Sequence, residues 1–267
     1  MPATTLRVEL LDMTPEAEGL IYTAAKRCTS SDDAERIYDD AIERSPNIDN
    51  IWVHTKIPYK EQAGLIRRVL ASGHDSVVEH VSFTFAVAGV SRALSHQLVR
   101  HRIASYSQQS QRYVKADGFD YVKPESIRPL DSKHIRIPVP GGGIECLNAN
   151  AIFKEAMDCC QLAYNRLTEL GIPAEDARYV LPNACETKLV VTMNCRSLLH
   201  FFELRCCNRA QWEIRALANA MLGICKDRLP IVFEKAGARC KRLGYCPEAK
   251  QCREHMEKEA AKAADGE

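Results

Sequence analysis

Residues 100–113 read Arg-His-Arg-Ile-Ala-Ser-Tyr-Ser-Gln-Gln-Ser-Gln-Arg-Tyr, a cationic triplet followed by hydroxyl and amide side chains. The preceding residues 91–101 have helical spacing, with Leu94, Leu98 and Ala93 expected to face inward. We therefore expect the triplet at the end of a helix, where neighbouring side chains point about 100° apart. Two arginines that point in different directions can hold two anions, or two parts of one large ligand.

The rest of the chain predicts many helices and few strands. The expected strands cover residues 6–11, 81–87 (ending before Gly89) and 188–193. The expected helices cover residues 14–28, 31–43, 59–72, 150–170, 197–206, 209–229 and 230–243. Thr14 is expected to cap the first helix, and residues 117–143, with four prolines, are expected to form a loop. Because helices and strands do not alternate strictly, we expect an α+β fold with a mixed or antiparallel sheet flanked by helices.

Composition excludes several classes of protein. The formal net charge is +1, which argues against a broadly basic nucleic-acid protein and against an acidic disordered chain. The longest charge-free stretch, residues 81–91, is far shorter than the about 20 residues of a membrane helix, and we expect no signal peptide. We expect a single domain over residues 1–245, followed by a C-terminal tail over residues 246–267, and a cytoplasmic location without membrane association.

The 12 cysteines show no short paired framework. We expect reduced, mostly buried thiols, because a chain of this length does not need disulfides for stability. The spacing of Cys240, Cys246 and Cys252 could be half of a metal site, but no Cys-x2-Cys pair is present and we predict no metal.

The charge is unevenly distributed, since residues 80–116 contain no aspartate or glutamate. Five cations lie in this acid-free segment: Arg92, Arg100, Arg102, Arg112 and Lys115. They indicate either a solvated or internally paired basic surface, or a site for an anionic ligand. Arginine suits a site for an anionic ligand because its planar guanidinium can donate two parallel hydrogen bonds to two phosphate oxygens. A phosphatase with a histidine nucleophile is disfavoured, because Arg102 stands where such enzymes carry a glycine.

Taken together, Arg100-His101-Arg102, Ser105, Ser110 and Arg112-Tyr113 resemble the motif of flavin-dependent thymidylate synthases. Further elements of the resemblance are Gly73-His74-Asp75-Ser76-Val77-Val78-Glu79-His80, Leu181-Pro182-Asn183, Asn194-x-Arg196-Ser197-Leu198, Leu204-Arg205 and Arg209-Ala210-Gln211-Trp212-Glu213-Ile214-Arg215. The resemblance covers about residues 50 to 235.

The resemblance implies an enzyme of the methyltransferase class that makes dTMP from dUMP. Its carbon donor is 5,10-methylenetetrahydrofolate, its cofactor is FAD and its reductant is NADPH. It also implies a homotetramer whose core is built by a long helical segment and whose active sites are shared between subunits. The absence of a Gly-x-Gly-x-x-Gly fingerprint is compatible, because this family binds FAD without one.

The resemblance also implies roles for individual residues. The expected FAD contacts are His74, Ser76, Arg100, His101, Arg102, Gln108, Arg205, Asn208 and Arg209. The expected dUMP contacts are Gln97, Arg100, Gln108, Gln109, Ser110, Gln111, Arg112, Lys188 and Arg215, with Arg112 on the phosphate. The expected catalytic residues are Arg215, Ser110 and His74, with Arg215 stabilising negative charge that develops on the uracil ring.

Several alternatives stay open. Ser110 as a covalent nucleophile would need a base partner, which the sequence does not identify. His80 competes with His74, and Lys188 replaces an arginine common in the family. Arg209 replaces a histidine or asparagine, and Gln108 replaces a glutamate found in some members. A non-catalytic module that uses residues 80–116 to bind a nucleotide or a nucleic acid is the second hypothesis, although we expect no nucleic-acid partner.

Overall fold

The computed structural model describes residues 3–42, 57–127, 134–139, 143–249 and 252. The chain divides into two compact units. The first unit comprises Met1–Arg7, Val87–Arg100 and Tyr106–Val190, and the second comprises Val8–Ala86, His101–Ser105 and Val191–Glu267. The single domain expected over residues 1–245 stays a prediction, and most of the expected tail lies outside the described residues.

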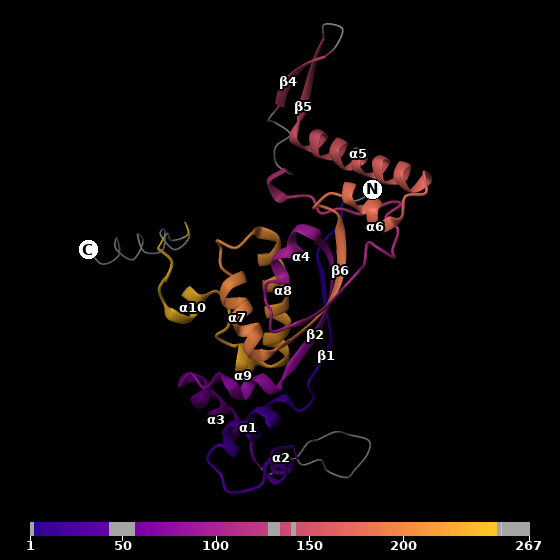
Figure 1. The fold of residues 1–267 in the computed structure, drawn as a ribbon. Coiled ribbons are helices and arrows are strands. Elements are labelled where there is room, and N and C mark those ends of the chain that lie inside the picture. The colour runs from indigo at the N-terminus through magenta and orange to yellow at the C-terminus, as the bar shows by residue number, and fades with distance from the viewer. Residues whose placement is uncertain (1–2, 43–56, 128–133, 140–142, 250–251, 253–267) are drawn as a thin grey trace, which may run out of the picture. The chain divides into compact units, whose positions relative to one another are not determined.

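Helices and strands are mixed along the chain, which confirms the α+β class (Figure 1). The strands are β1 (Arg7–Met13), β2 (Ser82–Ser91), β3 (Ser105–Gln108), β4 (His134–Val139), β5 (Gly143–Asn148) and β6 (Glu186–Asn194). The α-helices are α1 (Ala17–Arg27), α2 (Ala34–Ile42), α3 (Tyr59–Ala71), α4 (Arg92–Leu98), α5 (Ala149–Glu169), α6 (Ala174–Ala177), α7 (Cys195–Arg205), α8 (Trp212–Arg228), α9 (Pro230–Phe233) and α10 (Arg239–Leu243). Three 3₁₀ helices complete the described elements: η1 (Asp75–His80), η2 (Glu125–Ile127) and η3 (Arg178–Val180).

Strands β1, β2, β6 and β3 hydrogen-bond in that order in a four-stranded sheet, and β4 pairs with β5 in an antiparallel hairpin. The first part of β2 and all of β6 alternate between buried and partly exposed side chains, as the period of two predicts. No described helix is long and apolar enough to cross a membrane.

Strand β2 runs on to Ser91, so the expectation that it ends before Gly89 is wrong. Gly89 has φ +71°, and a Cβ atom there would lie 1.8 Å from the carbonyl oxygen of Thr5. Its amide also donates to the Glu186 carboxylate at 2.9 Å. The glycine therefore permits a close backbone approach inside a strand, which is a common reason for glycine in such positions.

Helix α4 ends at Leu98, so the Arg100-His101-Arg102 triplet follows the helix and does not form its last turn, contrary to expectation. The Tyr106 hydroxyl donates to the Leu98 carbonyl oxygen at 2.9 Å. This bond satisfies a carbonyl that lacks a helical partner, which stabilises the early end. Leu94 and Leu98 are buried as expected, whereas Ala93 is exposed.

The hairpin of β4 and β5 lies partly within residues 117–143, where a loop was expected. Proline and glycine are typical of turns, which is why a loop was expected here. In the structure, Pro138 belongs to β4 and Gly143 begins β5. A two-stranded hairpin consists only of edge strands, where proline is tolerated.

The second unit packs its helices around aromatic side chains. Phe233 makes edge contacts with Phe83 and Phe202, with ring centroids 5.8 Å and 5.9 Å apart. Helix α1 packs against α2 and α3, and α7 packs against η1 and α8. Thr14 does not cap α1 as expected, because its hydroxyl accepts the Ser82 amide at 2.9 Å. Glu16 occupies the N-cap position and makes no capping hydrogen bond with its side chain.

The helix expected over residues 230–243 is two short helices, α9 and α10. Between them Gly237 has φ +146°, which interrupts the helical conformation. The other expected helices and strands are present within a few residues of their predicted ends.

Candidate functional site

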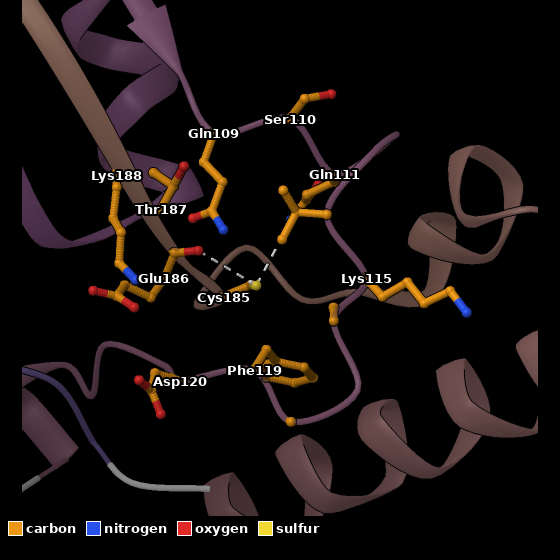
Figure 2. A pocket seen from close by; sticks show the side chains of 13 residues that line it. Gln109, Ser110, Gln111, Lys115, Phe119, Asp120, Cys185, Glu186, Thr187 and Lys188 are labelled. Carbon is orange, nitrogen blue, oxygen red and sulfur yellow. Dashed lines mark hydrogen bonds between the residues drawn. The ribbon is translucent and has the colours of Figure 1, made fainter.

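The first unit contains a cavity of about 150 Å³ between the segment that follows β3 and the start of β6 (Figure 2). Its lining is polar on most sides and comprises Gln109, Ser110, Gln111, Val114, Lys115, Ala116, Gly118, Phe119, Asp120, Cys185, Glu186, Thr187 and Lys188. Four of the expected dUMP contacts are among them, namely Gln109, Ser110, Gln111 and Lys188. Small-molecule sites have roughly 300–1,000 Å³, so this cavity has room for only part of a nucleotide.

Hydrogen bonds to β6 hold the polar segment in place. The Gln109 amide donates to the Lys188 carbonyl oxygen at 2.9 Å, and the Gln108 side chain donates to the Thr187 hydroxyl at 3.0 Å. Beyond them the Ser110 hydroxyl accepts the Arg112 amide at 3.2 Å. The hydroxyl and amide side chains expected to meet dUMP are therefore gathered beside one strand.

Arg112, assigned to the phosphate, does not line this cavity and is paired with a carboxylate. Its Nε lies 3.1 Å from Glu175 Oε2. The Nε of Arg178 donates to the backbone carbonyl oxygen of the same glutamate at 2.9 Å. Glu175 therefore contacts Arg112 through its carboxylate and Arg178 through its backbone carbonyl, and both ends of the Arg112 pair are about half exposed.

Arg92 lies near Arg178 and Cys185. Burial lowers the pKa of its guanidinium, and the cation of Arg178 lowers it further, while the thiol of Cys185 acts in the opposite direction. Arg100 and Arg102 are exposed and have no ion pair with any residue that the structure describes. The sequence left open whether the cations of the acid-free segment are paired or solvated. The segment contains both, since Arg112 is paired and Arg100 and Arg102 are solvated.

In the second unit, His101 lies against Arg205 and two rings of α7. Its Nε2 accepts a hydrogen bond from Arg205 Nε at 3.0 Å, and its ring meets Phe201 edge-on at 4.9 Å. Burial lowers the pKa of His101 to about 4, with further lowering by the Arg205 cation and by His200. His101 is therefore neutral at pH 7, and its acceptor nitrogen orients Arg205.

This shift predicts a loss of stability in mild acid. Between pH 6.5 and about 4 the unfolded chain binds a proton at His101 that the folded chain does not bind. The free energy of unfolding should therefore fall as the pH falls through this window. Urea denaturation at pH 7.0 and 5.0 measures the effect, and His101→Gln should lose less stability between the two pH values than the unmodified protein. An equal loss in both proteins would contradict the assignment.

Helix α8 and the turn before it bring three expected site residues together. Arg215 Nη1 donates to the Asn208 carbonyl oxygen at 2.7 Å. Arg209 Nη1 donates to Glu248 at 3.1 Å, which ties the turn to the C-terminal segment. Asn208 and Arg209 are exposed, whereas Arg215 is half-buried.

His74 and Ser76 are both exposed at the start of η1, directly after Gly73, whose φ is +80°. His80, the competitor of His74, is exposed as well, so exposure does not separate the two histidines. Glu79 forms an ion pair with Arg196. That pair joins two sequence elements that lie far apart along the chain.

The expected residues are divided between the two units. Those in the first unit are Gln97, Arg100, Gln108, Gln109, Ser110, Gln111, Arg112 and Lys188. Those in the second unit are His74, Ser76, His101, Arg102, Arg205, Asn208, Arg209 and Arg215. Sequence reasoning missed Asp120, Glu175, Arg178, Cys185, Glu186 and Thr187, which no local motif marks.

All 12 cysteines are free, and the expectation that most are buried is wrong, since only Cys185, Cys195 and Cys225 are. Cys240 lies near Cys207, Cys246 and Cys252, and its pKa is raised chiefly by burial. In the described part of the chain no three histidine, cysteine or acidic side chains form a group that could hold a metal ion.

Residues 9–231 match a protein-family model described as "thymidylate synthase complementing protein". The chain is 48% identical over 263 residues to a flavin-dependent thymidylate synthase of Nitratidesulfovibrio vulgaris, covering 94% of this chain and 95% of that protein. It is 44% identical over 245 residues to the enzyme of that name from Geobacter sulfurreducens, covering 91% of each. Among solved structures, the UMP/dUMP methylase PolB from Streptomyces cacaoi, bound with 5-Br dUMP, matches 86% of this chain and 94% of its own. Its TM-score is 0.65 and its identity is 26%.

Proposed function

Because the chain belongs to the family of flavin-dependent thymidylate synthases, we propose that it converts dUMP to dTMP by reductive methylation. FAD is its cofactor, and methylenetetrahydrofolate and NADPH are its co-substrates. The observation that carries the proposal is the wall of the cavity. Gln109, Ser110 and Gln111, which the family motif assigns to dUMP, line that wall opposite the start of β6.

The paired arginines of the first unit suit the phosphate of dUMP. Arg112 and Arg178 already share the acidic residue Glu175, whose carboxylate stands where a doubly charged phosphate could bind Arg112. A guanidinium prefers phosphate because two parallel N–H groups meet two oxygens. Because the Arg112 pair with Glu175 is about half exposed, it is weak enough for a phosphate to replace it.

The second unit supplies a donor set that fits FAD. Arg102, Arg205 and Arg209 carry the positive charge that a pyrophosphate needs, and no glycine-rich fingerprint is present to bind it at a helix N-terminus. Neutral His101 holds Arg205 by a hydrogen bond without adding a charge of its own. When bound, FAD supplies the reducing equivalents of the reaction.

Activation of the uracil falls to Arg215 in this proposal. Its hydrogen bond to the Asn208 carbonyl oxygen fixes the guanidinium at the start of α8. A fixed cation at the edge of the ring stabilises negative charge that develops there without reorganising during the reaction.

Two candidate nucleophiles near the cavity are unsuited to attack the ring. The Ser110 hydroxyl contacts the Arg112 amide, and none of the described residues acts as a base toward it. Burial raises the pKa of the Cys185 thiol to about 11, which leaves roughly one thiolate in ten thousand at pH 7. Both observations support a reaction without an enzyme nucleophile.

Other copies of this chain complete the site in this proposal. The cavity of about 150 Å³ is smaller than a nucleotide site needs, which favours further walls from neighbouring subunits. The proposal therefore includes a homotetramer with a long helical segment in its core. A cytoplasmic location is a separate part of the proposal.

The test is a reconstitution with purified protein. We expect a yellow protein that retains or binds FAD, and dTMP that forms only when dUMP, methylenetetrahydrofolate and NADPH are all present. Mass spectrometry of the nucleotide products measures the reaction. A colourless protein that ignores added FAD but binds nucleotides would support the binding module and overturn the enzyme.

A further inference from the structure

Cys185 lies between an apolar cluster and the cavity. Only 3% of its surface is exposed, and it packs with Phe119, Tyr121 and Met157. Figure 2 shows its sulfur directed toward Gln111, and both residues line the cavity. The proposed reaction uses no enzyme thiol, so this buried cysteine has another role or none.

The backbone of Cys185 is held on both sides. Its amide donates to the Pro182 carbonyl oxygen at 3.0 Å, and its own carbonyl oxygen accepts the Arg92 amide at 3.0 Å. Because the side chain is also enclosed by the apolar cluster, the sulfur atom has a fixed position in the first unit.

The sulfur makes two hydrogen bonds of opposite sense. It donates to the Glu186 carbonyl oxygen at 3.6 Å and accepts from Gln111 Nε2 at 3.7 Å. The thiol keeps its proton at neutral pH, because burial raises its pKa. A protonated thiol has one proton to donate, so the Glu186 contact leaves the lone pairs for Gln111.

Gln111 lies in the middle of the segment that faces the cavity. Backbone hydrogen bonds hold the two ends of this segment. The Gln109 amide donates to the Lys188 carbonyl oxygen at 2.9 Å, and the Val114 amide donates to the Ser110 carbonyl oxygen at 3.0 Å. Between these two bonds, the Gln111 side chain donates a hydrogen bond to Cys185, the residue that directly precedes β6. The neighbours of Gln111 in sequence are Ser110 and Arg112.

We propose that Cys185 is a positioning residue that fixes Gln111, and through it Ser110 and Arg112, in the geometry that binds dUMP. The proposal rests on the proposed function, because it takes this segment as the wall that meets the nucleotide. Cys185 acts through Gln111 and does not react itself.

The experiment compares Cys185→Ala, Cys185→Ser, Gln111→Ala and the Cys185→Ala/Gln111→Ala double variant as FAD-loaded proteins. Loss of one weak hydrogen bond should raise the KM for dUMP about fivefold to tenfold, with kcat within about twofold. The double variant should be no worse than Gln111→Ala alone, because Cys185 acts only through Gln111. Serine keeps a donor and an acceptor, so Cys185→Ser should recover most of the affinity.

Cys160→Ala is the matched control, since Cys160 packs on the same apolar cluster and, among the described residues, the hydrogen bond of the Gln111 side chain goes to Cys185 and not to Cys160. Amide hydrogen exchange at residues 109–114 gives a second measurement that needs no nucleotide, and it should be faster in Cys185→Ala than in Cys160→Ala. Additive KM effects, no recovery by serine, or unchanged exchange would each overturn the proposal. A kcat loss of about 1,000-fold in both Cys185 variants would instead assign a nucleophile. If the unmodified protein forms no dTMP, the proposed function fails, while the exchange measurement still decides whether Cys185 positions the segment.

Discussion

Arg215→Ala should lower kcat for dTMP formation by about 1,000-fold while FAD remains bound. The residue is half-buried in the first turn of α8, and its Nη1 donates to the Asn208 carbonyl oxygen at 2.7 Å. Alanine removes the cation that would stabilise the activated uracil, whereas the hydrogen bonds of the helix backbone are unaffected. Stopped reactions analysed for dTMP measure kcat, and flavin absorbance of the purified variant measures FAD content.

Two further variants separate charge from geometry. Arg215→Lys keeps the positive charge but loses the planar fork, so its kcat should lie between those of the unmodified protein and the alanine variant. Arg228→Ala changes an exposed arginine in the last turn of the same helix and should leave kcat unchanged. Undiminished turnover by Arg215→Ala would refute the catalytic role.

Local patterns predicted the helices well because their signals lie within a few residues. The helix over residues 59–72 was expected to stop at Gly73, and α3 ends at Ala71 with Gly73 at φ +80°. The end of α4 could not be predicted in this way, because Tyr106 accounts for it from eight residues further along the chain. Gly89 was interpreted as a strand end for a similar reason, since its partner Thr5 lies far away in sequence.

The candidate site shows the same limit. The motif over residues 100–113 pointed to one side of the cavity, because its spacing can be compared with a known family. The opposite side, Cys185 and Glu186, lies at the start of β6, which begins at Glu186. Only the pairing of the polar segment with that strand brings the two sides together. Glu175 is separated from Arg112 by 63 positions, so no spacing within the motif could have indicated their ion pair.

The second large effect is expected for Arg112→Ala, which should weaken dUMP binding about 100-fold with a much smaller change in kcat. Two charge-assisted hydrogen bonds to a phosphate account for a loss of this size. Glu175 would then lack its partner, and its negative charge would further disfavour the phosphate. Isothermal titration of FAD-loaded protein with dUMP measures the affinity.

The distinguishing control uses the ligand as well as the protein. Deoxyuridine lacks the phosphate, so its weak binding should be the same in Arg112→Ala and in the unmodified protein if Arg112 contacts only the phosphate. Arg136→Ala, on the exposed β4 strand of the same unit, should change neither affinity. Glu175→Gln removes the competing carboxylate and keeps the shape of the side chain, so it should bind dUMP at least as tightly as the unmodified protein. If the carboxylate only competes with the phosphate, its removal should raise the affinity for dUMP. Weaker binding by Glu175→Gln would therefore show that the carboxylate holds Arg112 in place for the phosphate.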